Sequence, residues 1–151
     1  MVVSMEIRIA TAADVDALAV LKQLWSPPAQ PPTEASREEF ATTLGTWMQA
    51  NNATCMVADL DGELVGMAWL IVFERVPNPD ARRRLGGDIQ SVYVIAEHRG
   101  QGVGRRLVQA LCALADERGV ARVTVHSGTR TTGFYERLGF QHSGVLLQRE
   151  R

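Results

Sequence analysis

Only two cysteines occur among the 151 residues of this chain. Cys55 and Cys112 are too few for a disulfide framework or a cysteine-rich metal cluster, so we expect buried free thiols and no metal site. Long apolar runs are absent as well: no stretch approaches the length that spans a bilayer, and the first residues lack the basic and apolar regions of a signal peptide. These absences predict a cytoplasmic protein without a membrane partner.

An excess of positive charge is also missing. The chain has 16 Lys and Arg against 17 Asp and Glu, for a net charge of -1. A dedicated nucleic-acid binder usually shows a strong basic excess, so the balance argues against a nucleic-acid partner. The length and the 46% hydrophobic content fit one domain over residues 1–151, with a substantial core and one active site.

Hydrophobic periodicity predicts strands and helices that alternate along the chain. Thr11 and Asp14 suit the start of a first helix, Ser36 and Glu39 suit the start of a second, and Asp61-Gly62 is typical of a hairpin turn. Four prolines within residues 26–33 predict a stiff loop between the two helices. The predicted strands are 7–10, 54–60, 63–73, 88–95, 120–126 and 140–148, and the predicted helices are 11–24, 36–50, 103–118 and 131–138.

The most informative segment is an apolar strand that passes, through Gly100, Gly102 and Gly104, into a helix. Unpaired N–H groups and the positive end of the dipole favour an anion at a helix start, and glycines let the backbone approach it closely. Arg105 and Arg106 oppose that dipole, which suggests that a bound polyanion resolves the conflict. A solvated basic turn is the alternative, and the glycines favour a phosphate site.

Two familiar glycine motifs do not fit this segment. A dinucleotide fingerprint needs glycine where Arg105 stands, and a P-loop needs a Gly-Lys-Ser/Thr run that the chain lacks. Instead, Arg99-Gly100-Gln101-Gly102-Val103-Gly104 resembles motif A of the GNAT family of acyl-CoA-dependent N-acyltransferases. Downstream, residues 123–126 followed by 133–140 resemble motif B of the same family, with its Phe-Tyr-x-x-Leu-Gly-Phe ending.

The resemblance implies an α/β GNAT fold, in which a mixed central sheet of six to seven strands is flanked by about four helices. It implies acetyl-CoA as cosubstrate, with the pyrophosphate on the amides of the glycine turn and the pantetheine arm along a splayed strand. A backbone N–H of that strand would stabilise the developing oxyanion of the thioester. The implied cofactor-binding residues are Val92, Tyr93, Val94, Arg99, Gly100, Gln101, Gly102, Val103, Gly104 and Arg105.

By the same resemblance, Tyr135 falls on the general-acid tyrosine of the family and would protonate the CoA thiolate. A phenol with a pKa of about 10 can share or give up a proton to a thiolate whose thiol has a pKa of about 8.5. The alternative role for Tyr135 is a core tyrosine that anchors the short helix. We therefore predict an N-acetyltransferase in which a primary amine attacks the thioester directly.

The general base is open on the sequence. Many family members carry a carboxylate at the position of Gln90 or Ser91, and neither of these side chains accepts a proton usefully. Asp88 lies on the same strand face as Gln90 and could act through water, and His126 is the other titratable candidate. Asp88 could instead be only a turn residue, and His126 only a strand-end residue. A third option is that ordered water takes the proton and no dedicated base exists.

The acceptor is equally open, because the first two helices and their loop, which shape it in this family, carry no diagnostic motif. Trp25, Trp47 and Trp69 could line an apolar acceptor pocket, although their spacing favours core packing for at least two. Small-molecule and peptide amines both fit, and a homodimer through terminal-strand contacts is compatible with the resemblance. The alternative function is a non-catalytic acyl-CoA-binding or sensing module, which the missing carboxylate at Gln90 makes conceivable.

Overall fold

The protein, described over residues 4–151 by a computed structural model, is built on one mixed sheet. Within that range the sheet has five strands in the order β1-β2-β3-β4-β5. Neighbouring strands are antiparallel except for β4 and β5, which run parallel. The elements are β1 (Met5–Ile9), α1 (Val15–Trp25), α2 (Glu34–Ala50), β2 (Ala53–Leu60), β3 (Glu63–Arg75), β4 (Arg84–Val94), α3 (Val103–Glu117), β5 (Arg122–Val125) and α4 (Thr132–Arg137).

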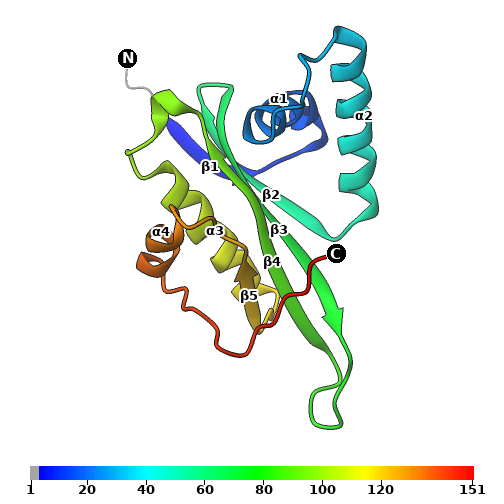
Figure 1. Cartoon of the computed structure of the whole chain (residues 1–151), viewed down its shortest axis with the longest axis vertical. Coiled ribbons are helices and arrows are strands. Elements are labelled where there is room, and N and C mark those ends of the chain that lie inside the picture. The colour runs from blue at the N-terminus through cyan, green and yellow to red at the C-terminus, as the bar shows by residue number, and fades with distance from the viewer. Residues whose placement is uncertain (1–3) are drawn as a thin grey trace.

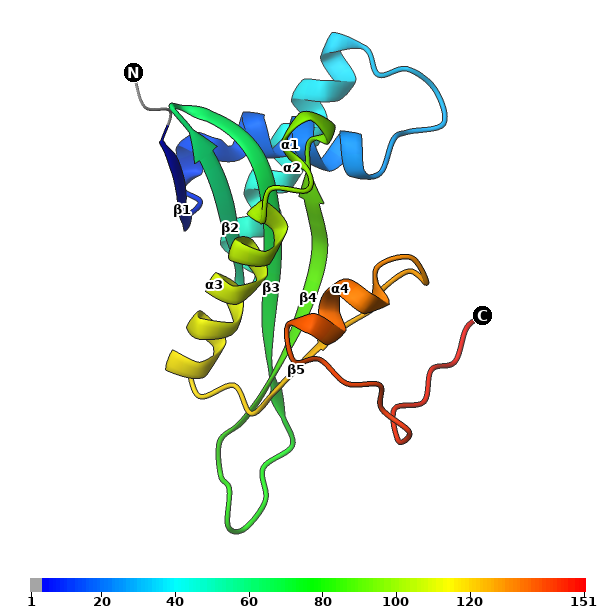
Figure 2. The ribbon, with the colours of Figure 1, turned by 90° about the vertical axis from the view of Figure 1, so that its left-hand side faces the viewer.

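Helices cover the sheet on both faces, with α1 and α2 on one side and α3 and α4 on the other (Figures 1 and 2). The core is correspondingly divided in two. Leu107 and Leu111 of α3 are fully buried on one face, and Leu18 of α1 is fully buried on the other. The predicted α/β class is therefore confirmed, and no helix of residues 4–151 is long and apolar enough to cross a membrane.

The predicted strand over residues 140–148 is wrong, which leaves five strands in the described chain rather than six to seven. Residues after Phe140 form an irregular segment that carries exposed apolar side chains, Val145 and Leu147 at 83% and 90% exposure. The reason is local. The Ser143 hydroxyl accepts the backbone N–H groups of Val145 and Leu146, so the segment turns on itself instead of extending along β5.

Helix α2 begins two residues before the predicted start. Thr33, not Ser36, is the N-cap, because the Thr33 hydroxyl accepts the Ser36 N–H at 3.1 Å. Before α1, the Thr11 N–H donates to the Asp14 carboxylate at 2.7 Å as predicted, but residues Ala12–Asp14 form a single 3-10 turn ahead of the α-helix. The helix boundaries thus shift while the helices themselves are confirmed.

Strand β4 is longer than predicted, because it starts at Arg84 rather than at Asp88. Gly86 belongs to the strand, where the Phe73 ring of β3 lies over it and a Cβ would come within 2.5 Å of that ring. The glycine therefore makes room for a cross-strand aromatic. Beyond this pair, the β3–β4 connection projects away from the rest of the molecule (Figures 1 and 2).

Two side-chain expectations also change. Trp69 is buried, but Trp47 is 36% exposed and Trp25 is 44% exposed, so one tryptophan rather than two packs in the core. Cys55 is a buried free thiol as expected, whereas Cys112 is only half-buried. The two exposed tryptophans lie on α1 and α2, which cover the sheet with narrower apolar stripes than α3 does.

An ionic cluster ties β1 to the chain that leads into α1. The Arg8 guanidinium contacts the Asp14 carboxylate at 2.8 Å and the Asp59 carboxylate at 3.0 Å. Hydrogen bonding from Arg8 lowers the pKa of Asp14 from 3.8 to about 2. Because the folded pKa is depressed, this carboxylate stabilises the fold fully above pH 3.8, and the contribution is lost as the pH falls through about 2.

We expect Asp14→Asn to lower the free energy of unfolding by about 1–2 kcal/mol at pH 7, since Arg8 is partly exposed. The difference from the parent protein should shrink as the pH is lowered from about 4 to 2, as followed by urea unfolding. Asp16→Asn is the matched control, because Asp16 is an exposed carboxylate in the first turn of the same helix. A pH-independent difference for Asp14→Asn would contradict the ionic explanation.

Candidate active site

Strand β4 carries a bulge in the middle of the sheet. Trp69 of β3 pairs with Gln90, whereas Met67 pairs with Tyr93, so the register shifts between them. Ser91 lies in the bulge with a φ of +51°, a left-handed conformation that is uncommon outside glycine. A bulge bends its strand and increases the local twist, so it redirects the end of β4 relative to the rest of the sheet.

The end of β4 separates from β5. The parallel ladder between the two strands runs from Gly86 paired with Arg122 to Ile89 paired with Val125, where β5 ends. Strand β4 continues to Val94, still paired with β3 on its other side. The β5-facing edge of residues 92–94 therefore lies outside the parallel ladder, as a splayed strand requires.

The glycine turn between β4 and α3 is open on its outer side. Gly100 and Gly102 have φ values of +75° and +81°, and a Cβ on Gly100 would meet nothing within 4 Å. Gly102 is the N-cap of α3 and has no side chain to cap the helix. The Arg106 N–H donates to the Gly102 carbonyl at 3.1 Å, so the helical amides before it have no intrahelical acceptor.

The three arginines of this region have different surroundings. Arg105 folds back toward the turn, with its Nη2 atom 3.5 Å from the position of a Cβ on Gly102. Arg106 points to β1, where its Nη2 donates to the Met5 carbonyl at 3.4 Å. Arg99 donates from Nε to the Val94 carbonyl at 2.7 Å and lies over the Tyr93 ring, 5.2 Å from its centroid. Arg105 is thus the cation beside the open turn.

The start of α3 meets α4 at Gly104. A Cβ on Gly104 would lie 3.6 Å from the Phe134 ring and 3.8 Å from the Val94 side chain. The glycine turn, the end of β4 and the helix that carries Tyr135 consequently converge on one place. The two segments that the sequence singled out, residues 99–104 and 133–140, are therefore neighbours in space.

Tyr135 is 8% exposed and packs edge-on against Phe134 and Phe140, with ring centroids 4.9 and 5.5 Å away. Within residues 4–151, no side-chain nitrogen or oxygen is fully buried without a hydrogen-bond partner. The Tyr135 hydroxyl is therefore not an unpaired polar group sealed in the core. Burial raises the pKa of the Tyr135 phenol above its usual value of 10. The hydroxyl therefore keeps its proton at neutral pH.

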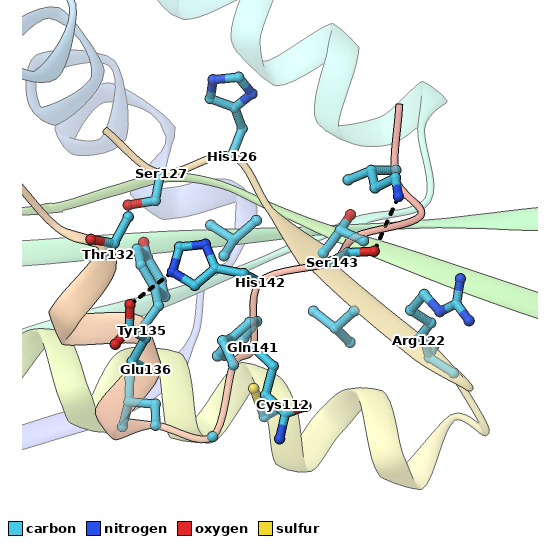
Figure 3. A pocket seen from close by; sticks show the side chains of 18 of the residues that line it. Cys112, Arg122, His126, Ser127, Thr132, Tyr135, Glu136, Gln141, His142 and Ser143 are labelled. Carbon is cyan, nitrogen blue, oxygen red and sulfur yellow. Dashed lines mark hydrogen bonds and ion pairs between the residues drawn. The ribbon is translucent and has the colours of Figure 1, made fainter. Parts of the chain in front are cut away.

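Tyr135 lines a groove of about 1040 Å³ between β5, α4 and the segment after α4. Figure 3 shows Tyr135 beside Thr132 in this groove, with Ser127 close by at the end of β5. On the other side, His142 contacts the Glu136 carboxylate at 2.9 Å. Sequence reasoning missed this pair, because the two residues lie six positions apart across the end of α4 and no motif connects them.

The two candidate bases lie on neighbouring strands, Asp88 within β4 and His126 directly after β5. The Asp88 carboxylate accepts a hydrogen bond from the Gln90 amide at 2.8 Å and another from the Thr124 hydroxyl at 2.9 Å, which fixes it between β4 and β5. His126 is exposed just beyond the end of β5, and its ring points away from Tyr135 and His142 in Figure 3. His126 thus lines the same groove as Tyr135 with its ring turned away from the tyrosine, and Asp88 does not line that groove.

The acetyltransferase (GNAT) family profile matches residues 18–140 of this sequence. The chain belongs to this family. Among curated GNAT relatives, glucosamine 6-phosphate N-acetyltransferase 1 of rice is 31% identical over 133 residues, which cover 86% of this chain and 76% of that protein. The corresponding enzyme of Trypanosoma brucei brucei is 34% identical over 80 residues, which cover 53% of this chain and 52% of that protein. The chain spans about half the length of the first two curated relatives it matches.

Solved structures share the GNAT fold. A Trypanosoma brucei acetyltransferase superposes with a TM-score of 0.77 at 23% identity, covering 98% of this chain and 100% of that one. A protein of Clostridium acetobutylicum described as a predicted acetyltransferase, solved with acetyl-CoA, superposes with a TM-score of 0.76 at 19% identity, covering 97% of this chain and 96% of that one. GNAT acetyltransferases use acetyl-CoA as the acetyl donor.

A further polar contact of this GNAT chain joins the bulge to α1. Lys22 donates from Nζ to the Ser91 hydroxyl and lies over the Trp25 ring, 4.0 Å from its centroid. Burial lowers the pKa of Lys22. Sequence reasoning missed this contact because 69 positions separate the two residues. The one available signal was that Lys22 is the only lysine in the sequence.

Proposed function

We propose that this chain is an N-acetyltransferase domain over residues 1–151 that transfers the acetyl group of acetyl-CoA to a primary amine. The observation that carries the proposal is the convergence at Gly104 of the open glycine turn, the splayed end of β4 and the helix that holds Tyr135. An anion site, a free strand edge and a protonated phenol suit the diphosphate, the pantetheine amides and the thiolate of one cosubstrate.

The residues of the turn fit a diphosphate. The amides of residues 100–105 would donate to its oxygens, and the Arg105 guanidinium beside Gly102 would balance its charge. Val92, Tyr93 and Val94 would pair with the pantetheine arm through the edge that β5 leaves free. Arg99 acts indirectly in this arrangement, because its bond to the Val94 carbonyl and its position over Tyr93 fix the end of β4.

Acetyl-CoA supplies the acetyl group as a thioester. The amine nitrogen forms a bond to the carbonyl carbon, the carbon–sulfur bond breaks, and the Tyr135 hydroxyl gives its proton to the departing sulfur. The proton that leaves the amine nitrogen returns through water to the Tyr135 oxygen, so the phenol is restored at the end of the cycle. Asp88 would take part only through water, since both of its carboxylate oxygens already accept hydrogen bonds.

The acceptor would be a small molecule with a primary amine. Two curated relatives are named for glucosamine 6-phosphate, a phosphorylated amino sugar. In this chain the end of α1, the proline-rich loop and the start of α2 line an open pocket of about 610 Å³ at Lys22, a volume suited to a compact ligand. Phe40 provides the aromatic surface of that pocket.

Acetyl-CoA should raise the melting temperature of the protein, because a ligand bound only by the folded state stabilises it by RT ln(1 + [L]/Kd). At a concentration of about 100 Kd the expected gain is about 2.7 kcal/mol. The measurement is a thermal melt with and without acetyl-CoA, and the controls are buffer alone and adenosine. An unchanged melting temperature at saturating acetyl-CoA would remove the donor assignment.

Turnover is tested by thiol release with a panel of primary amines, including glucosamine 6-phosphate. Release that depends on the amine, together with the acetylated product by mass spectrometry, is the expected result. Binding of acetyl-CoA without amine-dependent release across the panel would instead favour the non-catalytic acyl-CoA-binding module.

A further inference from the structure

Lys22 is a half-buried cation with no acidic partner. The ion-pair contacts of residues 4–151 involve Arg8 and His142, and none of them involves Lys22. Among the residues that the structure describes, its ammonium donates to the Ser91 hydroxyl and lies over the Trp25 ring. A buried charge is usually paired with an opposite charge, so an unpaired one leaves attraction for an anion unused.

Apart from Lys22, the pocket is lined by neutral side chains, some polar and some apolar. Its wall is formed by the end of α1, the proline-rich loop and the first turns of α2. No carboxylate lies among its lining residues, although the chain as a whole carries slightly more acidic than basic side chains. The polar lining residues are Lys22, Gln23, Ser26, Gln30, Thr33 and Ser36.

Lys22 also fixes where this pocket lies relative to the proposed chemistry. Ser91, which accepts its hydrogen bond, is the residue with positive φ in the bulge of β4, directly before residues 92–94. An anionic group held by Lys22 would thus place the rest of a small ligand near the point where β4 and β5 separate. The prolines at 28, 31 and 32 restrict the loop, so little conformational entropy is lost when a ligand binds.

We propose that Lys22 is a specificity-determining residue, whose ammonium binds a carboxylate or phosphate of the acceptor in the pocket between α1 and α2. The substrates are then small primary amines that also carry an acidic group. This inference rests on the proposed acetyltransferase function and specifies its substrate class. Without the acidic group, an amine would leave the Lys22 charge unpaired and would bind more weakly.

The test compares Lys22→Met with the parent protein on three kinds of amine: an amino sugar phosphate, an amino acid and a neutral amino sugar. Loss of a charge-assisted contact should raise KM for the two anionic amines by roughly 10- to 100-fold, while KM for the neutral amine changes less than about threefold. Lys22→Arg should restore part of the loss because it keeps the charge. The relative effects on the phosphate and the carboxylate substrates show which anion the pocket takes.

Arg37→Met is the matched control, because it removes an exposed cation from the first turns of α2 that does not line the pocket. It should leave all three KM values unchanged. Equal effects of Lys22→Met on charged and neutral amines would assign Lys22 to support of the bulge and overturn the proposal. Failure of the acetyltransferase function itself is distinguished by the parent protein, which would then bind no acetyl-CoA or release no thiol with any amine.

A second measurement needs no turnover. Reductive methylation with ¹³C-formaldehyde labels Lys22 and the N-terminal amine alone, because the chain has one lysine. The dimethyl-Lys22 signal, assigned by its absence in Lys22→Arg, should shift on titration with inorganic phosphate or acetate and should not shift with the neutral amino sugar. A signal that stays fixed through saturating concentrations of both anions would overturn the proposal.

Discussion

Replacing Tyr135 by phenylalanine should lower turnover by on the order of 10²-fold or more and leave the Kd for CoA within about threefold. Phenylalanine keeps the ring that packs edge-on against Phe134 and Phe140, so the fold should be preserved. It removes only the hydroxyl, whose proton the departing sulfur would receive. Steady-state thiol release measures the turnover, and calorimetric titration with CoA measures the affinity.

The pH dependence follows from the burial of Tyr135. Because burial raises the pKa of the phenol above 10, the acid form should persist through the whole neutral range. The rate of the parent protein should therefore show no loss from titration of Tyr135 below pH 10. An alkaline fall that also occurs in Tyr135→Phe would belong to another group.

Phe140→Leu separates proton donation from packing. It removes one of the two rings that contact Tyr135 and leaves the hydroxyl in place. Turnover within a few-fold of the parent protein is expected for this variant. Equal turnover of Tyr135→Phe and the parent protein would exclude Tyr135 from the reaction and leave it as a packing residue of α4.

The parts of the site that the sequence predicted correctly are those with strict local requirements. Gly100 and Gly102 adopt positive φ, a backbone conformation that other residues rarely take, so the glycines themselves report the turn. The hairpin at Asp61-Gly62 was predictable for the same reason, since both residues have positive φ. Strong amphipathic periodicity likewise located α3.

The parts that were missed depend on competition between contacts. Ser143 captures two backbone N–H groups and diverts an apolar segment from strand pairing, a choice that periodicity does not reveal. Thr33 and Ser36 are both good capping residues, and the bond from the Ser36 N–H to the Thr33 hydroxyl decides between them only in the folded chain. The contact of Lys22 with Ser91 requires the fold itself, because helix α1 brings the lysine to the bulge.

Replacing Gly102 by valine should weaken acetyl-CoA binding by roughly 100-fold. At a φ of +81° a β-branched residue is strained by about 1–2 kcal/mol, so the turn is expected to change conformation and redirect its amides. Hydrogen bonds to a charged group contribute about 1.5–3 kcal/mol each, and losing one or two of them accounts for the expected drop in affinity. Calorimetric titration of the variant with acetyl-CoA measures it.

Gly119→Val is the matched control for this variant. Gly119 has a φ of +74° and open space around its Cβ position, and it follows the other end of the same helix. Both substitutions impose a similar backbone strain on the ends of α3, so both should lower the melting temperature by a similar amount. Only Gly102→Val should lose affinity for acetyl-CoA, because only the N-terminal end of α3 presents free amides. Equal affinities in the two variants would mean that the pyrophosphate is held elsewhere, and the open turn would then be a connection between β4 and α3 without a role in binding.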